Sequence, residues 1–268
     1  MNVAILGGGN LGTAIARGIT QKNLYKKEDV IITRRNATLL DELSQEGFAV
    51  TDSNTDAIRK AEIIIISVLP QQLNQVLTSI KDGIDPTRHT VISIVTGVTV
   101  GDLRKHLGSE TSIVRAMPNT AIAIGESMTC IASDSTSTAA SVELTKHIFD
   151  AVGKTLVIKE EQMLAATALC ACGIAFFLRA IRAASQGGIE ISFHSEEALM
   201  MAAQTARGAA GLLANEHSHP ENEIDKVTSP RGCTIAGLNQ MEHHGFSSAM
   251  IRGIITSAEK AGNLYKTD

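Results

Sequence analysis

Residues 3–12 read Val3-Ala4-Ile5-Leu6-Gly7-Gly8-Gly9-Asn10-Leu11-Gly12, and this stretch decides the fold of the N-terminal half. An apolar run leads into glycines with G-x-G-x-x-G spacing, and residues 13–19 continue with helical period. The first glycine permits a tight turn, the second lets the backbone approach a pyrophosphate, and the third lets helix and strand pack closely. The N–H groups of the helix start favour phosphate. The stretch predicts a dinucleotide-binding loop.

More apolar runs continue the pattern. They are β-branched, lack polar alternation and are separated by helical segments such as 38–46; they cover residues 30–32, 63–68 and 90–95. Such runs are typical of strands buried on both faces of a parallel sheet. We therefore expect an α/β fold with a Rossmann-type doubly wound sheet. Edge strands are expected at residues 113–115 and 128–131, and a last strand at residues 155–158.

The amino-acid composition changes after Lys159, where the chain becomes rich in Ala, Leu and Ile. Helical periodicity predicts one long helix closed by Gly187-Gly188 and two later ones, at residues 160–189, 196–215 and 247–264. We therefore divide the chain into a dinucleotide-binding domain, residues 1–158, and an all-helical domain, residues 159–268.

Composition excludes several classes of protein. The 268 residues carry a formal net charge of −4 and no tryptophan, so neither a basic surface nor stacking rings favour nucleic acid. No signal-like segment precedes residue 3, and apolar runs such as 63–68 are too short to cross a membrane. Cys130, Cys170, Cys172 and Cys233 show no disulfide or zinc spacing. We expect reduced thiols in a cytoplasmic protein.

The choice of cofactor depends on the end of the second predicted strand. An NAD-binding protein usually has an acidic residue there to bind the ribose hydroxyls. This chain has Thr33-Arg34-Arg35, a hydroxyl and two guanidiniums that suit a 2′-phosphate. NADPH is therefore expected, with NADH as the alternative; Arg35 is equally compatible with a solvated loop charge.

Polar turns at other strand ends are candidates for ligand contacts, because ligands bind at the carboxyl ends of parallel strands. They are residues 67–71, 95–97 and 115–120. Asn54 precedes a helix and is either its N-cap or an adenosine contact. Residues 228–234 precede another helix, and their Ser, Thr and Gly content suits either an anion site or a plain N-cap.

Taken together, five motifs in order resemble the pyrroline-5-carboxylate reductase family over nearly the whole chain. The motif closest to that family's signature is Thr228-Ser229-Pro230-Arg231-Gly232-Cys233-Thr234-Ile235-Ala236-Gly237-Leu238. The others are the glycine loop, the Val-x-Pro-Gln segment at 68–71, Met117-Pro118-Asn119-Thr120 and Ala171-Cys172-Gly173.

The resemblance implies reduction of the cyclic imine 1-pyrroline-5-carboxylate to L-proline, the last step of proline synthesis. The implied pyrophosphate contacts are Gly7, Gly9, Asn10 and Leu11, and Gly12 belongs to the same cofactor loop. The 2′-phosphate contacts are Thr33, Arg34 and Arg35, the adenosine contact is Asn54, and the nicotinamide contacts are Val68, Leu69, Pro70 and Thr96. The substrate contacts are Ser229, Gly232, Cys233 and Thr234.

The implied catalytic group is the Thr234 hydroxyl, which would hydrogen-bond the ring nitrogen, and no strong general acid is needed. The implied assembly is a homodimer through the helical half, often built into larger rings, with an active site spanning two subunits. The family usually has Lys, Gly and Pro at the positions of Leu69, Arg231 and Ile174. These departures bear on substrate identity more than on reaction class.

Two alternatives stay open: a reductase of a related cyclic imino acid, and a non-catalytic NADP(H)-binding sensor. A β-hydroxyacid dehydrogenase is disfavoured, because that family depends on a Lys in its first long helix and residues 160–190 contain none. His217, His219, His243 and His244 lack accompanying metal ligands at a recognisable spacing, so no metal is expected.

Overall fold

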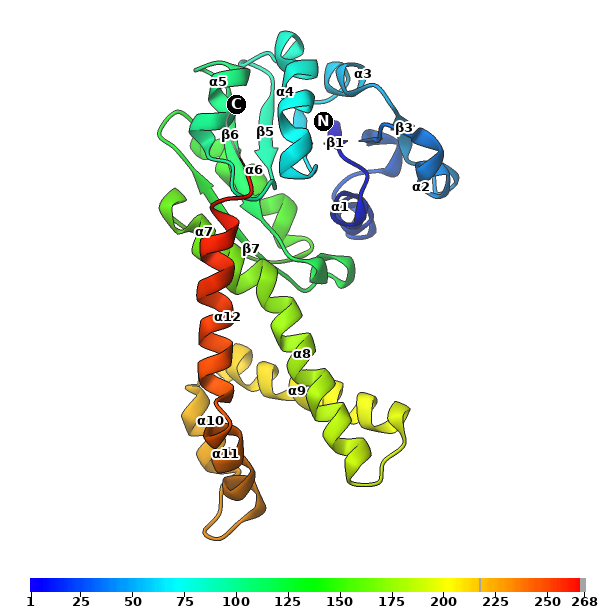
Figure 1. Cartoon of the computed structure of the whole chain (residues 1–268). Helices are drawn as coiled ribbons and strands as arrows, with labels where there is room; N and C mark the ends of the chain where they lie inside the picture. Colours follow the sequence, from blue (N-terminus) through cyan, green and yellow to red (C-terminus); the bar gives the residue numbers. More distant parts are fainter. Residues whose placement is uncertain (217, 266–268) are drawn as a thin grey trace. The chain divides into compact units, whose positions relative to one another are not determined.

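The computed structural model describes residues 1–216 and 218–265. These fall into two compact units, Met1–Cys172 with the segment from Thr256 onward, and Gly173–Ile255 (Figure 1). The division at residue 159 predicted from composition falls shortly after the last strand, which ends at Val157. The first unit continues beyond it because Met163, at the start of the long helix, packs on Met117 and Ala132 of the sheet.

The first unit contains one eight-stranded sheet of order β3-β2-β1-β4-β5-β6-β7-β8. Neighbouring strands are parallel except for the antiparallel pair β6 and β7. The strand order reverses between β1 and β4, which is where ligands bind in doubly wound sheets. The strands are β1 (Val3–Leu6), β2 (Val30–Thr33), β3 (Ala49–Thr51), β4 (Ile63–Ile66), β5 (Thr90–Ser93), β6 (Ser112–Met117), β7 (Ser127–Ser133) and β8 (Gly153–Val157).

Helices cover both faces of this sheet, because alternate residues of each strand point to opposite sides. Val3 and Ile5 belong to a core shared with α1 (Asn10–Gln21) and α6 (Ala139–Asp150). Ala4 and Leu6 belong to a second core, shared with α3 (Asn54–Arg59), α4 (Leu73–Ile80) and α5 (Val100–Leu107). The predicted doubly wound α/β fold is confirmed.

The strands at the edges of the sheet differ from the prediction. β6 and β7 were expected at the edge but lie inside the sheet, and every residue of β6 is buried. The edges are β8 and β3, and β3 was not predicted at all. β3 has only three residues, all half-buried, so it lacks the continuous apolar run that marks the central strands.

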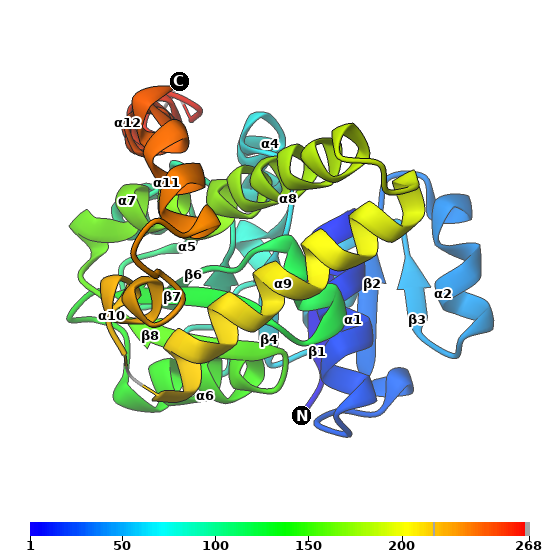
Figure 2. The same ribbon diagram turned by 90° about the horizontal axis from the view of Figure 1, so that it is seen from below.

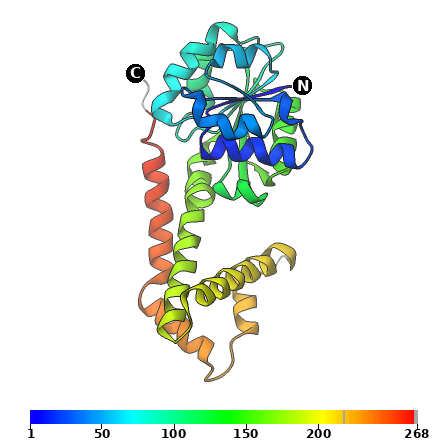
Figure 3. The ribbon, with the colours of Figure 1, turned by 90° about the vertical axis from the view of Figure 1, so that its right-hand side faces the viewer.

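The described residues of the second unit form helices and the turns that connect them, without a strand. α8 (Gly173–Glu190) and α9 (Ser195–Glu216) form a helical hairpin (Figure 2), and the Cα of Gly188 faces Ala198 so closely that an added Cβ would lie 3.0 Å from the alanine side chain. α10 (Pro220–Lys226) and α11 (Cys233–His243) follow. α12 (Phe246–Ala261) lies beside α8, where Gly253 faces Phe176 (Figures 1 and 3).

The long helix predicted at 160–189 is present but not uniform. A 3-10 turn (Glu160–Gln162), α7 (Met163–Ala166) and a π-helical segment (Thr167–Cys172) lead into α8. The predicted closure at Gly187-Gly188 is wrong, because both residues lie within α8. Their carbonyls accept from the N–H groups of Ile191 and Phe193, which close the helix after Glu190.

By length and composition, the helical segment at residues 160–190 could cross a membrane. Of its most apolar 18-residue stretch, 22% is buried. The prediction that no apolar segment reaches that length is therefore wrong. The second unit buries little of itself: of its described residues only Gly173, Ser185 and Ala198 are buried. Its exposed apolar side chains include Phe177, Leu178 and Ile251. A unit this poor in core needs a covering surface.

Candidate functional site

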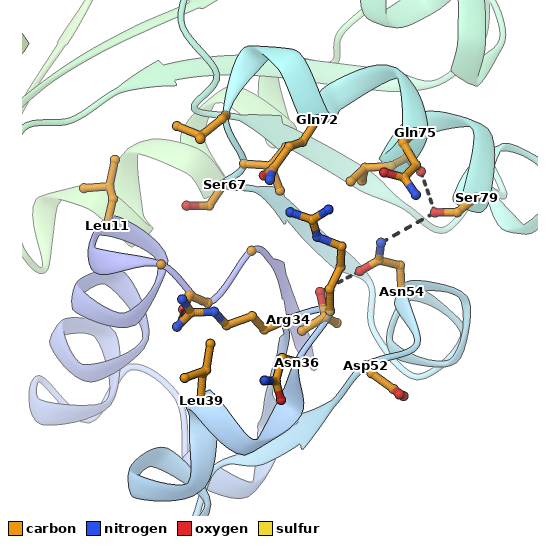
Figure 4. Close-up of a pocket in the computed structure, with 18 of the residues that line it drawn as sticks. Leu11, Arg34, Asn36, Leu39, Asp52, Asn54, Ser67, Gln72, Gln75 and Ser79 are labelled. Atoms are coloured by element: carbon orange, nitrogen blue, oxygen red, sulfur yellow. Dashed lines mark hydrogen bonds between the residues drawn. The ribbon is translucent and has the colours of Figure 1, made fainter.

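A pocket of about 1240 Å³ opens at the carboxyl ends of β1, β2 and β4 (Figure 4). It lies at the reversal of strand order, and residues from both sides of that point line it. Among the residues predicted to contact cofactor, those that line it are Gly7, Gly9, Asn10, Leu11, Thr33, Arg34, Arg35, Asn54, Val68, Leu69, Pro70 and Thr96.

The glycine loop forms the floor of this pocket. The N–H groups of Gly7 and Gly8 donate to the carbonyl of Thr33 at 3.2 and 2.7 Å, which binds the loop to the end of β2. Gly7 has φ of +116°, and a Cβ there would lie 2.0 Å from the Ser67 carbonyl oxygen. An added Cβ at Gly9, in contrast, meets nothing within 4 Å. The loop therefore needs glycine at 7 for its own geometry and leaves space over Gly9.

Gly12 does not line the pocket, in contrast to the other predicted residues of the loop. It is buried in α1, where a Cβ would lie 2.2 Å from the Gly7 carbonyl oxygen. Its contribution is the close packing of helix and loop. The first turn of α1 follows directly from Gly9, and among the described residues no side chain caps this helix. Its N–H groups are thus available to a phosphate.

The end of β2 supplies the positive charge of the pocket. Thr33 is buried, and its hydroxyl donates to Asn54 Oδ1 at 2.6 Å. Arg34 Nη1 donates to the Gly8 carbonyl at 3.2 Å, so the guanidinium lies over the glycine loop. Among the described residues that line the pocket, the carboxylate is that of Asp52, which lies at the outer edge of the pocket (Figure 4). This end of the pocket therefore favours an anionic group.

Asn54 is not the N-cap of α3, which was one of its two predicted roles. Ser53 occupies that position, and its hydroxyl accepts from the Asp56 N–H at 3.2 Å. The amide of Asn54 instead joins Thr33 to Ser79 Oγ, to which its Nδ2 donates at 3.5 Å. Asn54 therefore connects the end of β2 with α4 across the pocket.

The opposite end of the pocket is apolar. Val68, Leu69 and Pro70 follow β4, and Thr96 follows β5. Gly97, next to Thr96, has φ of +79°, and a Cβ added there would lie 2.8 Å from the Ala261 carbonyl oxygen and 3.5 Å from Tyr265 N. Tyr265 Oη donates to Asn74 Oδ1 of α4 at 2.8 Å. The C-terminal segment thus packs behind the loop that forms this end.

Sequence reasoning missed several residues that line the pocket. Gln72, Gln75, Val76 and Ser79 share one face of the segment that includes α4. Their spacing of three and four residues is the signal that could have identified this face. Asn36, Leu39 and Asp52 follow β2 and the unpredicted β3, so no strand end marked Asp52.

Arg115 does not face a ligand, although it begins the polar turn at 115–120. Its side chain is 4% exposed and lies inside β6, with Nη1 donating to Glu160 Oε1 at 3.2 Å. The same carboxylate oxygen accepts from the Val100 N–H at 2.7 Å. Burial lowers the pKa of Arg115, and Glu160 opposes that shift. Glu160 thus connects β6, the start of α5 and the start of the long helix.

Replacing Glu160 by alanine should destabilise the protein by about 3 kcal/mol, because the Arg115 charge would be left buried without its partner. The measurement is the free energy of unfolding in urea. Glu161→Ala is the matched control, since Glu161 is the exposed neighbour. Equal stability of the two variants would contradict a structural role for the Arg115–Glu160 pair.

The predicted substrate residues lie in the second unit. Ser229 and Gly232 form a turn in which the Gly232 N–H donates to the Ser229 carbonyl at 2.9 Å. Gly232 then precedes α11, and among described residues no side chain caps this helix. Cys233 and Thr234 occupy its first turn. Free N–H groups at such a helix start suit a carboxylate.

Arg231 has φ of +61°, a left-handed conformation that glycine adopts readily and arginine rarely does. This backbone conformation explains why the family that the chain resembles is expected to have glycine at this position. The arginine keeps the same backbone conformation at a cost of about 1 kcal/mol.

The histidines provide no metal site within the described part of the chain. No group of three or more His, Cys, Asp or Glu there has the geometry to hold a metal ion. His243 and His244 contact one another edge-on, with ring centroids 5.3 Å apart. His217 lies outside the described residues.

The sheet order, the glycine loop and the pocket define a Rossmann-type dinucleotide-binding protein with a helical C-terminal region. Comparison with known proteins is more specific. Residues 2–97 match the family model for NADP oxidoreductase, coenzyme F420-dependent, and residues 160–264 match the model for pyrroline-5-carboxylate reductase dimerisation.

Two relatives from Dictyostelium discoideum are similar throughout the chain. Pyrroline-5-carboxylate reductase 2 is 50% identical, covering 97% of this chain and 92% of the relative. Pyrroline-5-carboxylate reductase 1 is 53% identical over 98% of this chain, which spans half of that relative's length. The crystal structure of the Plasmodium falciparum pyrroline carboxylate reductase with NADP bound has a TM-score of 0.89 and 27% identity, covering 99% and 98% of the two chains.

The chain belongs to the pyrroline-5-carboxylate reductase family. The predictions of this family and of an oxidoreductase are confirmed. An NADP(H) cofactor agrees with the NADP oxidoreductase model over the unit that holds the pocket. The family membership favours an enzyme over the non-catalytic sensor.

Proposed function

We propose that this protein reduces 1-pyrroline-5-carboxylate to L-proline with NADPH. The observation that carries the proposal is the pocket itself. Its glycine floor, its two arginines and its apolar end occur in one chain with the family's Ser229–Thr234 loop. NADPH, when bound, supplies a hydride to the imine carbon.

The residues of the pocket hold and orient the cofactor in this proposal. The start of α1 and Gly9 receive the pyrophosphate, and Arg34 and Arg35 the 2′-phosphate. Thr33 and Asn54 support the adenosine end through their hydrogen bond. Val68, Leu69, Pro70 and Thr96 line the nicotinamide end, where apolar walls exclude water.

The loop before α11 holds the substrate. N–H groups around Gly232, Cys233 and Thr234 bind the carboxylate, with Ser229 shaping the turn. The Thr234 hydroxyl hydrogen-bonds the ring nitrogen and so orients the imine carbon. The imine is partly protonated near neutral pH and accepts hydride directly, so the site needs no positioned acid.

The test follows NADPH oxidation by its absorbance with 1-pyrroline-5-carboxylate as substrate. Parallel assays use the six-membered cyclic imino acid and NADH. Turnover highest with the five-membered ring and NADPH is the expected result. Preference for the six-membered ring would instead identify a related imino acid reductase. Tight NADPH binding without turnover on either ring would support the sensor.

Arg34→Ala should raise the KM for NADPH by roughly 10- to 100-fold, because a charged hydrogen bond contributes about 1.5–3 kcal/mol. The KM for NADH should change much less, since NADH lacks the 2′-phosphate. Arg59→Ala is the matched control: Arg59 is an exposed arginine of α3 outside the pocket.

An equal rise for both cofactors would contradict recognition of the 2′-phosphate by Arg34. It would indicate instead that its hydrogen bond to the Gly8 carbonyl orders the glycine loop. The two roles are thereby distinguished within one set of kinetic measurements.

The protein acts as a homodimer through its helical region in this proposal, assembled further into a ring and located in the cytoplasm. The exposed apolar side chains of α8, α9 and α12 support a second copy as the covering surface, because this unit lacks a core of its own. Each active site would then combine residues of two subunits. Native mass spectrometry measures the assembly, and a monomer at micromolar concentration would contradict it.

A further inference from the structure

Two thiols from distant parts of the chain face each other within the first unit. Cys130 lies in β7 and Cys170 in the π-helical segment, and their sulfur atoms are 4.0 Å apart. Cys130 is 3% exposed, whereas Cys170 is half-buried. The pair is therefore shielded on one side and reachable by a small molecule on the other.

The hydrogen bond between these thiols makes them chemically unequal. Either thiol can donate in this contact. The hydrogen bond lowers the pKa of Cys170 to about 7, while the same contact and burial raise the pKa of Cys130. Cys170 is therefore the more readily ionised of the two, and the thiolate is the reactive form. Cys130 remains a thiol beside it. This is the arrangement of an attacking and a resolving cysteine.

The backbone around Cys170 is a π-helical turn tied to the sheet. The π-helical turn at 167–172 is a rare, wider helical geometry, which occurs frequently at functional sites. Asn119 Nδ2 donates to the Cys170 carbonyl at 3.2 Å and holds the backbone in register with the sheet. A disulfide bond is about 2 Å long, so the two sulfur atoms must approach each other by about 2 Å to form one.

We propose that Cys130 and Cys170 form an oxidation site that hydrogen peroxide converts to a disulfide. The Cys170 thiolate attacks one peroxide oxygen: an S–O bond forms, the O–O bond breaks, and hydroxide leaves and takes up a proton to become water. The Cys130 sulfur then attacks the Cys170 sulfenic acid: the S–S bond forms, the S–O bond breaks, and the Cys130 proton leaves with the oxygen as a second water.

The disulfide would link the π-helical segment to β7 next to the turn at 117–120. Asn119 belongs to that turn, and its N–H donates to Ser127 Oγ of β7 at 3.1 Å. Oxidation would therefore join the sheet covalently to the start of the long helix. The proposal does not depend on the reaction that the protein catalyses.

The test treats the reduced full-length protein with hydrogen peroxide, blocks remaining thiols with iodoacetamide and maps tryptic peptides by mass spectrometry. The Cys172→Ser variant is used beside the unchanged protein, because Cys170 and Cys172 share the peptide 160–179. The expected product is peptide 116–146 joined to peptide 160–179, with the loss of two hydrogens. Cys233 should remain alkylated as an internal control.

In a second arm, Cys130→Ser removes the resolving thiol, so Cys170 should stop at the sulfenic acid, which dimedone traps. A third arm needs no substitution at the pair: the rate of Cys170 alkylation should rise with pH with a midpoint near 7. Preferential oxidation of Cys172 or Cys233, a bond between two chains, or four cysteines that stay reduced would overturn the proposal.

Discussion

Replacing Gly9 by valine should lower the affinity for NADPH by roughly 10- to 100-fold while leaving the fold intact. Gly9 has φ of −87° and ψ of −171°, an extended conformation that any residue adopts. An added Cβ there meets no protein atom within 4 Å, and Gly9 lines the pocket. The new side chain would therefore occupy the space where the proposed pyrophosphate approaches. Overpacking of that kind costs about 1–3 kcal/mol.

The measurement is a fluorescence titration with NADPH together with thermal unfolding. Gly101→Val is the matched control, because Gly101 lies in α5 outside the pocket and also has room for a side chain. Gly7→Ala provides the contrast: its positive φ and the Ser67 carbonyl make it a folding defect, visible as a lower Tm. Normal NADPH binding by the Gly9 variant would contradict the proposed position of the pyrophosphate.

The central strands could be predicted because strands that are buried on both faces have continuous apolar sequences. β1, β2, β4 and β5 are continuous apolar runs, since both faces of the sheet are covered. β3 escaped prediction because it is short and half-buried, so its side chains need not be apolar. The interior positions of β6 and β7 follow from pairing between strands, which no local pattern specifies.

The same contrast applies to the pocket. Residues next to a predicted strand end, such as Thr33 and Val68, were predicted as pocket residues, because the carboxyl ends of parallel strands converge. Gln75 and Ser79 were missed because they come from the face of a helix that only the packing of α4 turns toward the pocket. The pairing of Glu160 with Arg115 was likewise hidden, since 45 residues separate them.

The second unit shows a different limit of sequence reasoning. Its helices were largely predicted from periodicity, yet many of their described apolar side chains stay exposed. A pattern that normally predicts a buried helix face is satisfied here only when a surface outside the unit covers it. Local sequence therefore predicts that these helices form, but not what buries their apolar faces.

Replacing Thr234 by valine should lower kcat by roughly 100-fold and leave the Kd for NADPH unchanged. Valine keeps the size and branching of threonine and removes only the hydroxyl that is proposed to hydrogen-bond the ring nitrogen. Removing one well-placed hydrogen bond to a reacting group costs this order of magnitude. Thr234 lies in the first turn of α11, in the second unit, whereas the residues of the cofactor pocket belong to the first.

Thr234→Ser is the matched control, because it restores a hydroxyl and should recover most of kcat. Steady-state kinetics with 1-pyrroline-5-carboxylate give kcat and KM, and a fluorescence titration gives the Kd for NADPH. Retention of full kcat in the valine variant would exclude a catalytic role for this hydroxyl. A contact that only orients the imine should change kcat and leave the Kd for NADPH unchanged. Loss of NADPH binding with unchanged turnover per bound cofactor would therefore show that Thr234 contacts the cofactor and not the substrate.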